Sequence, residues 1–255
     1  MKLRQILSAA IISLTMMSAT AFSQTKVIAH RGFWKCDGSA QNSIASLRKA
    51  AEAKVYGSEF DVQLTSDGVA IVNHDGSING LVICKTPFSQ LKDISLSNGE
   101  KISTLEEYLI EGKKHKKLKL ILEIKSHPTK EMETQVTKEV VDLVKKHKMK
   151  KQVEYISFSP YICQELHRIT PKSKIASLAS EYDPDMVKNE LKVSGVDYQY
   201  GLLKKNPNWL SQCRKNKLSV NVWTVNNPKD IEEYIKMGVD FITTDEPLKA
   251  LELSK

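Results

Sequence analysis

Short apolar runs alternate with longer stretches whose apolar residues recur at helical spacing. Runs rich in β-branched and apolar residues are typical of strands, whereas an apolar stripe every three to four residues is typical of a helix that covers a sheet. The predicted strands cover residues 27–29, 57–64, 118–125, 153–159, 174–179, 196–202, 218–225 and 239–243. The predicted helices cover residues 42–54, 131–148, 161–169, 185–193, 207–216 and 228–237.

Repeated strand–helix units indicate a parallel sheet, and eight of them are the number that closes a TIM-type (β/α)8 barrel. A further strand over 69–74 follows Asp67-Gly68, a dipeptide typical of hairpin turns, and is expected to run antiparallel to its predecessor. We therefore predict an α/β barrel with an added return strand. An open doubly wound sheet is the alternative, and it is disfavoured because no glycine-rich nucleotide loop follows a strand.

The length of 255 residues fits one α/β barrel domain over 22–255, since no linker or repeat divides the chain. Residues 1–21 carry Lys2 and Arg4, then an apolar run, and end in small residues at Ala19-Thr20-Ala21. This order is typical of a cleaved secretory signal, and the run is shorter than the roughly 20 residues of a membrane span. We expect a secreted or periplasmic protein without a stable membrane span.

The net charge of +8, which would be +6 without the two cations of the signal, suits anionic ligands. Lysine-rich stretches over 113–117 and 145–151 end predicted helices, so we interpret them as solvated helix ends rather than as a nucleic-acid site. Four cysteines lack Cys-x-x-Cys spacing, which argues against a zinc site. Cys163 and Cys213 are expected in the core, whereas a Cys36–Cys84 disulfide is left open.

Polar residues at the carboxyl ends of barrel strands are the expected place for an active site. The first strand ends in His30-Arg31-Gly32, and the planar fork of Arg31 matches phosphate oxygens. Glu59 and Asp61 lie two apart on the second strand and so face the same side, where they repel unless a cation lies between them.

Two further strands add charged groups to this end of the barrel. A hairpin that turns about Asp67-Gly68 would place His74 across from Asp61. Glu123 and Lys125 repeat the two-residue spacing inside an apolar run, where burial of both charges favours a functional role. The sequence therefore gathers three carboxylates, two histidines, one arginine and one lysine.

Taken together, the order His-Arg-Gly, Glu-x-Asp, a histidine after the Asp-Gly turn, Glu-x-Lys, and late Val222-Trp223-Thr224-Val225 and Thr244-Asp245-Glu246-Pro247 resembles the glycerophosphodiester phosphodiesterase family. The resemblance runs from His30 to Pro247. It implies a metal-dependent hydrolase that cleaves a small-molecule glycerophosphodiester to glycerol phosphate and an alcohol.

The resemblance also implies the roles of the site residues. Glu59, Asp61 and Glu123 match metal ligands, and His30 and His74 match the general acid and base. Arg31 and Lys125 match phosphate contacts, and Phe158 and Trp223 match the pocket wall. Oxygen ligands point to Ca²⁺ or Mg²⁺ rather than zinc.

The chain departs from the family at the start of its first predicted helix. Gln41-Asn42-Ser43 stands where the family usually has Glu-Asn-Thr, so Gln41 lacks a negative charge, while Asn42 is expected to cap the helix. The segment over 74–104 is also short for the family's usual insertion. A lysophospholipid phosphodiesterase (phospholipase D-like) on the same fold and a non-catalytic phosphodiester-binding barrel remain alternatives.

Overall fold

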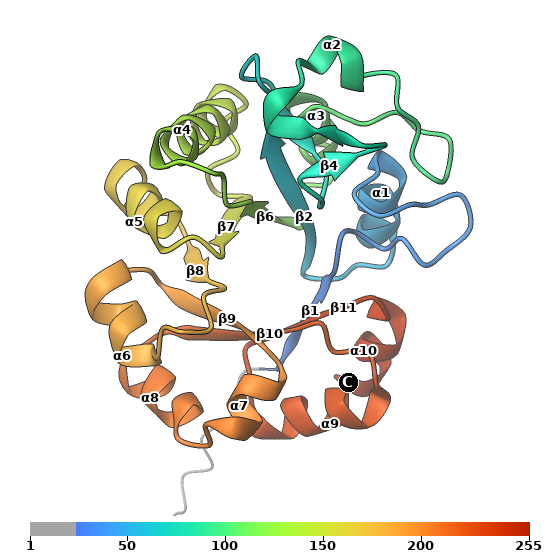
Figure 1. Ribbon diagram of the computed structural model, residues 1–255. Coiled ribbons are helices and arrows are strands. Elements are labelled where there is room, and N and C mark those ends of the chain that lie inside the picture. The colour runs from blue at the N-terminus through green and yellow to red at the C-terminus, as the bar shows by residue number, and fades with distance from the viewer. Residues whose placement is uncertain (1–23) are drawn as a thin grey trace, which may run out of the picture.

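Eight parallel strands close into a barrel, with one further strand outside the ring (Figure 1). The computed structural model describes residues 24–255, so the predicted signal over 1–21 lies outside the described residues. The barrel strands are β1 (Lys26–Ala29), β2 (Gly57–Leu64), β6 (Lys119–Ile124), β7 (Val153–Ser157), β8 (Ile175–Ser177), β9 (Gly195–Gln199), β10 (Ser219–Trp223) and β11 (Phe241–Thr244). β1 pairs in parallel with both β11 and β2, which closes the ring and confirms the predicted TIM-type architecture.

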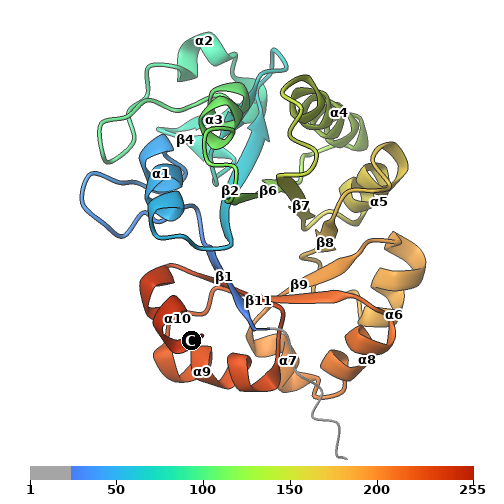
Figure 2. The same cartoon turned by 180° about the vertical axis from the view of Figure 1, so that it is seen from behind.

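Helices surround this barrel on the outside (Figures 1 and 2). They are α1 (Ile44–Glu52), α3 (Leu105–Gly112), α4 (Lys130–Lys146), α5 (Pro160–Ile169), α6 (Pro184–Met186) continuing into η2 (Val187–Leu191), α7 (Gly201–Lys205), α8 (Trp209–Lys215), α9 (Pro228–Met237) and α10 (Pro247–Leu253). The helix predicted over 228–237 has those bounds. The strand predicted over 196–202 ends earlier, at Gln199, because the Gln199 side chain accepts a hydrogen bond from Gly201 N (2.8 Å) where α7 begins.

Successive side chains of the barrel strands point alternately outward, to the hydrophobic core under the helices, and inward, to the barrel interior. Outward-facing residues such as Phe60, Val62 and Leu122 pack under the helices in the main hydrophobic cluster. Phe60 stacks on Tyr108 of α3 with ring centroids 4.3 Å apart. Because successive strand residues face opposite sides, the intervening Glu59, Asp61 and Glu123 point to the barrel interior.

The return strand β3 (Ala70–Val72) pairs antiparallel with β2, as predicted, but its register differs by one residue. Leu64 pairs with Ala70 and Thr65 N bonds Val69 O, so the loop contains the three residues 66–68 rather than Asp67-Gly68 alone. Gly68 takes the left-handed conformation that a three-residue hairpin needs (φ +82°). Asn73, whose N–H bonds Asp61 O, therefore lies across from Asp61, and the prediction that placed His74 there was wrong.

Between β3 and α3 the chain forms a small lobe at the rim of the barrel. It contains β4 (Ser77–Ile78), β5 (Leu81–Val82), η1 (Ile83–Lys85) and α2 (Phe88–Leu91). Ile83, Leu91 and Ile102 are buried together with Ile71 of β3 in a cluster of their own. The lobe is therefore anchored to the return strand that carries His74 at its end.

The four cysteines are free thiols. Cys163 and Cys213 are fully buried, as predicted, and Cys36 and Cys84 are partly exposed and unbonded. Within residues 24–255, no helix has the length and apolar character needed to cross a membrane.

Candidate active site

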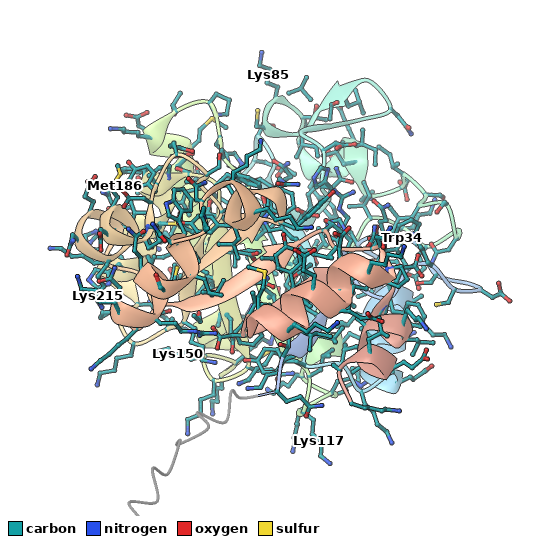
Figure 3. All side chains as sticks on the ribbon, turned by 90° about the horizontal axis from the view of Figure 1, so that it is seen from below. Trp34, Lys85, Lys117, Lys150, Met186 and Lys215 are labelled. Atoms are coloured by element: carbon teal, nitrogen blue, oxygen red, sulfur yellow. The ribbon has the colours of Figure 1, made fainter. Side chains whose placement is uncertain are left out.

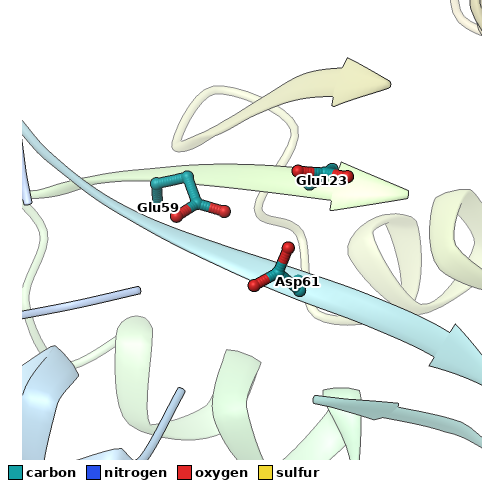
Figure 4. Close-up of side chains that lie close together, drawn as sticks. All are labelled: Glu59, Asp61 and Glu123. Atoms are coloured by element: carbon teal, nitrogen blue, oxygen red, sulfur yellow. The ribbon is translucent and has the colours of Figure 1, made fainter. Parts of the chain in front are cut away.

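Three buried carboxylates meet inside the barrel. Glu59 and Asp61 project from β2 and Glu123 from β6, the strand beside it (Figure 4). One oxygen from each lies within 4.8 Å of the others. Burial and repulsion from Asp61 and Glu123 raise the pKa of Glu59 well above its usual value. Three carboxylates this close in a buried place need a cation or protons, and an all-oxygen set of this kind fits Mg²⁺ or Ca²⁺.

Two cationic side chains border the carboxylates. Lys125 Nζ lies 2.8 Å from Glu123 Oε1 and 3.2 Å from Asp61 Oδ1. Burial and repulsion from Asp61 raise the pKa of Glu123 to about 7, although Lys125 opposes this shift. The pKa of Asp61 is lowered because Lys125 and the Asn42 amide outweigh its burial. Lys125 therefore keeps at least one carboxylate ionised.

Arg31 stands at the mouth of the site with a left-handed backbone (φ 54°). Its N–H donates to Glu59 Oε2 (2.8 Å), and its Nε lies 3.7 Å from Asp61 Oδ2. That Nε is buried and has no hydrogen-bond partner among the described residues. A buried guanidinium N–H without a partner is a strong donor for an incoming phosphate oxygen.

His30 is held by a carboxylate that the sequence analysis named in a motif without giving it a role. Asp245 Oδ1 lies 2.8 Å from His30 Nδ1, and the same residue accepts hydrogen bonds from Asn226 (2.8 Å) and Trp34 (3.1 Å). Burial alone would raise the pKa of Asp245, but these bonds, led by the one to His30, hold it at about 2. An ionised Asp245 fixes the imidazole so that its Nε2 is left for other contacts.

His74 reaches the same cavity from the end of the return strand. It is half-buried, and its Nδ1 lies 2.7 Å from Asp75 Oδ1. Burial lowers the pKa of the imidazole, with Lys125 and Arg31 acting in the same direction and Asp61 against them. The two predicted histidines thus line one cavity, each with a carboxylate on Nδ1.

The segment before α1 differs from the prediction. Ser43, not Asn42, caps the helix by accepting a hydrogen bond from Ser46 N. Asn42 has a left-handed backbone (φ 59°) and instead holds Asp61, donating through Nδ2 to Oδ2 (2.9 Å) and accepting from the Asp61 N–H (3.1 Å). Because Asn42 and Asp61 are 19 positions apart and meet only in the folded barrel, the sequence could not reveal the contact. Gln41 Oε1 accepts from an Arg31 Nη (2.6 Å).

Apolar and aromatic side chains close one side of the cavity. It has a volume of about 130 Å³ and is lined by both histidines, the three carboxylates, Arg31, Ile156, Phe158, Leu178, Asp197, Trp223 and Thr243. Phe158 and Trp223 meet edge to face with centroids 5.6 Å apart. All predicted site residues except Lys125 line this cavity directly, and Lys125 contacts two of its carboxylates.

A second, more open cleft adjoins the first at Arg31 and His74. Its volume is about 450 Å³, and its lining is largely polar, with Gln41, Asn73, Asp75 and Ser97 among the residues. A phosphodiester has two organic arms, so a phosphorus atom near Arg31 could direct one arm into each space. The site as a whole can neutralise an anion, transfer protons and hold two substituents of unlike polarity.

Comparison with known proteins finds relatives over nearly the whole described chain. Residues 30–249 match the model of the glycerophosphoryl diester phosphodiesterase family. A curated protein named glycerophosphodiester phosphodiesterase, from Caldanaerobacter subterraneus subsp. tengcongensis, is 29% identical over 90% of this chain and 98% of its own.

Solved structures show the same likeness. A crystal structure of a glycerophosphodiester phosphodiesterase from Parabacteroides distasonis is 48% identical, with a TM-score of 0.89 over 91% of this chain and 97% of that one. A second structure is of an Oleispira antarctica phosphodiesterase in complex with the product sn-glycerol-3-phosphate. It is 23% identical, with a TM-score of 0.79 over 90% of this chain and 96% of that one. At this level of identity the likeness shows the shared fold alone.

Proposed function

Because this chain belongs to the glycerophosphoryl diester phosphodiesterase family and is a phosphoric diester hydrolase, we propose that it cleaves glycerophosphodiesters to glycerol phosphate and an alcohol with the help of a divalent metal and two histidines. The observation that carries the proposal is the meeting of three buried carboxylates with Arg31 and Lys125 beneath two oriented histidines. A binding protein would need the cations but not this pair of imidazoles.

Phosphodiester hydrolysis requires that charge on the phosphoryl oxygens be neutralised. The unpartnered Nε of Arg31 is placed to donate to one of these oxygens. Lys125 adds a second positive charge, and burial strengthens both interactions because the local dielectric is low. A Mg²⁺ or Ca²⁺ ion held by Glu59, Asp61 and Glu123 would supply Lewis-acid stabilisation of the same oxygens.

Proton transfer is needed on both sides of phosphorus, since an alkoxide is a poor leaving group. His30 follows β1 and His74 follows β3, and both line the cavity, so one can accept a proton from the attacking group while the other donates to the leaving oxygen. Asp245 and Asp75 each lie within 2.8 Å of an Nδ1 and would hold the reacting Nε2 atoms toward the substrate.

The size of the aromatic-walled cavity favours a small substituent. About 130 Å³ accommodates a glycerol-sized group but not a long acyl chain, and the adjoining cleft that would take the other arm is lined mostly by polar residues. We therefore favour a water-soluble glycerophosphodiester over a lipid substrate. The predicted signal over residues 1–21 supports export to the periplasm or the medium as part of the same proposal.

The test is release of glycerol phosphate by residues 22–255 from a panel of glycerophosphodiesters and lysophospholipids, with Mg²⁺, with Ca²⁺ and with chelator. We expect turnover of the diesters that needs metal and is lost in Glu59→Ala. His30→Ala and His74→Ala should each lower turnover by roughly 10²–10⁴-fold while the protein stays folded.

His167→Ala is the matched control, because this histidine lies on α5, outside the cavity. Near wild-type turnover in either active-site variant would refute the acid–base assignment. Metal-independent turnover would refute the role of the carboxylates, and preferential cleavage of lysophospholipids would favour the lipid substrate.

A further inference from the structure

The connections from each helix to the next barrel strand lie together at the end of the barrel opposite the active site, because all eight barrel strands are parallel. These seven connections are residues 53–56, 113–118, 147–152, 170–174, 192–194, 216–218 and 238–240. They contain twelve lysines, all exposed, and a single acidic residue, Asp240. We call these lysines the basic face: Lys54, Lys113, Lys114, Lys116, Lys117, Lys148, Lys150, Lys151, Lys172, Lys174, Lys192 and Lys217.

The opposite end of the barrel has no such excess. The seven connections that follow β1, β6, β7, β8, β9, β10 and β11 hold three lysines or arginines and five acidic residues. Seen from below, Lys117 and Lys150 lie toward the bottom of the molecule and Lys85 of the rim lobe lies at the top (Figure 3). The positive charge of the chain is therefore concentrated away from the site that binds its anionic substrate.

Intramolecular ion pairs do not account for these lysines. Of the twelve, only Lys114 and Lys174 form a salt bridge within the described residues, with Glu111 and Glu154. The one acidic residue of these connections, Asp240, forms its salt bridge with Arg214 rather than with a lysine of the basic face. Ten lysines on one face thus repel one another without a carboxylate within 4 Å, which costs folding free energy unless an external anion compensates.

The backbone conformation of four of these lysines is a second, independent observation that favours a function for the basic face. Lys54, Lys148, Lys192 and Lys217 have left-handed backbones (φ 57–60°) at the ends of their helices. Glycine or asparagine is the usual residue at such a position, because other side chains are strained there. The connection after α9 does use glycine, at Gly238 (φ +76°). The other four positions carry lysine despite the conformational cost.

We propose that the basic face docks the protein on an anionic phospholipid surface, with the active site turned toward the aqueous phase. Exposed lysines from six separate connections match the diffuse negative charge of a bilayer. The large apolar side chains that are exposed among the described residues (Val82, Ile110, Phe158 and Leu248) all lie outside these connections. The one Phe, Tyr or Trp in these connections, Tyr56, is only partly exposed and packs against Phe241 with Lys26 and Lys174 beside its ring, so no open aromatic platform is offered to single-stranded nucleic acid.

The test is sedimentation with vesicles of phosphatidylcholine alone or with 40% phosphatidylglycerol added. Residues 24–255 are used, since they contain the complete closed barrel and its core. This protein should bind only the anionic vesicles, and 0.5 M salt should release it. The variant K54N/K148N/K192N/K217N keeps residues that accept the left-handed conformation, so it should stay folded. It should bind more weakly by roughly 600-fold, at about fivefold per lysine.

The control variant K85Q/K92Q/K205Q/K229Q removes the same net charge from exposed lysines elsewhere, and its binding should change by only severalfold. Equal losses in the two variants would overturn the proposal, because binding would then depend on net charge alone. Binding of neither vesicle would also overturn it, as would tighter binding of RNA than of anionic vesicles. The readout does not use turnover, so it is independent of the proposed catalytic function.

Discussion

At the scale of single residues, the charges of the site are set by their neighbours rather than by residue type. Asp61 and Glu123 face each other in the sheet register and share Lys125, yet the pKa of Asp61 is lowered and that of Glu123 is raised to about 7. Lys125, the hydrogen bond from Asn42 and the nearby His74 and Arg31 together lower the pKa of Asp61. The raised pKa of Glu123 reflects burial and repulsion from Asp61, which Lys125 opposes. Each side chain therefore performs its role only with its particular partners in place.

Asp245 provides the first test of this dependence. In Asp245→Asn the His30 imidazole loses its ionised partner at 2.8 Å, so we expect kcat to fall by on the order of 10²-fold or more with little change in KM. Glu246→Gln, which removes the neighbouring surface pair with Lys35, should leave both constants unchanged. Steady-state kinetics on a glycerophosphodiester measure both constants. An unaltered kcat in Asp245→Asn would exclude a role of Asp245 in orienting His30.

The ionised Asp245 should also contribute to the free energy of unfolding. The pKa of Asp245 is about 2 in the folded protein against 3.8 for the ordinary group, so its ionised form stabilises the fold above about pH 4 and this contribution is lost as pH falls toward 2. Wild type should lose roughly 1–2 kcal/mol more than Asp245→Asn over that interval in urea titrations. Parallel curves for the two proteins would contradict the lowered pKa.

Gln41 offers a second residue-scale prediction. Its Oε1 lies 2.6 Å from an Arg31 Nη, so in Gln41→Glu a full charge would pair with Arg31 and draw it away from Asp61. We expect the metal concentration for half-maximal activity to fall by roughly three- to tenfold, because Asp61 would be less neutralised and one more negative charge would be close. Gln90→Glu on α2 adds the same charge outside both site cavities and should have no effect. An unchanged or higher metal concentration for half-maximal activity in Gln41→Glu would contradict the expected gain in metal affinity.

At the scale of elements, the alternation of apolar and polar residues was sufficient to predict the eight barrel strands, their parallel order and the return strand. It could not fix the hairpin register, because Asp67-Gly68 fits both a two-residue and a three-residue loop and only the left-handed Gly68 within 66–68 distinguishes them. Nor could it assign Asp245 to His30, since those residues are 215 positions apart and meet only when β1 pairs with β11. Local patterns thus predicted the elements and the candidate residues, whereas tertiary pairing decided their contacts.

The turn after β1 supplies a prediction at this scale. Gly32 has φ +76°, and a Cβ there would lie 2.2 Å from Ser46 Oγ and 2.8 Å from the Ser46 backbone carbon of α1. Gly32→Ala should therefore destabilise the protein by about 2–4 kcal/mol and displace Arg31. Gly38→Ala has a similar φ (+73°) but no atom within 4 Å, so it should cost only about 1 kcal/mol. Equal effects of the two changes in urea unfolding would show that the contact with Ser46 is unimportant.

At the scale of the whole molecule, the barrel separates its two kinds of charge. Carboxylates that need a cation lie inside one end, and unpaired lysines cover the other. Without a bound cation or an external anion, both arrangements lower the free energy of unfolding, because like charges are held close together. The stability of the whole chain should therefore depend on what it binds.

Metal binding makes this dependence measurable through pH. Burial and neighbouring carboxylates raise the pKa of Glu59 well above 4.5 and that of Glu123 to about 7, so the folded state holds these protons more tightly than the unfolded one. Their contribution is complete below about pH 4.5 and is lost as pH rises through 7. In chelator, the free energy of unfolding should fall by about 2–3 kcal/mol across this interval. Mg²⁺ or Ca²⁺ at 100 times its Kd should restore about 2.7 kcal/mol at pH 7, because the ion binds only the ionised carboxylates of the folded state.

Two variants assign this effect to the carboxylate cluster. Glu59→Gln should weaken both the pH slope in chelator and the stabilisation by metal, because it removes one of the three converging charges. Asp197, whose pKa burial raises to about 7, lines the same cavity but is not one of the three converging carboxylates. Asp197→Asn should therefore reduce the slope in chelator while keeping most of the stabilisation by metal. If metal fails to stabilise wild type at pH 7, or stabilises Glu59→Gln as strongly, then the ion is bound elsewhere or not at all, and the metal-assisted hydrolysis proposed for this site would have to be abandoned.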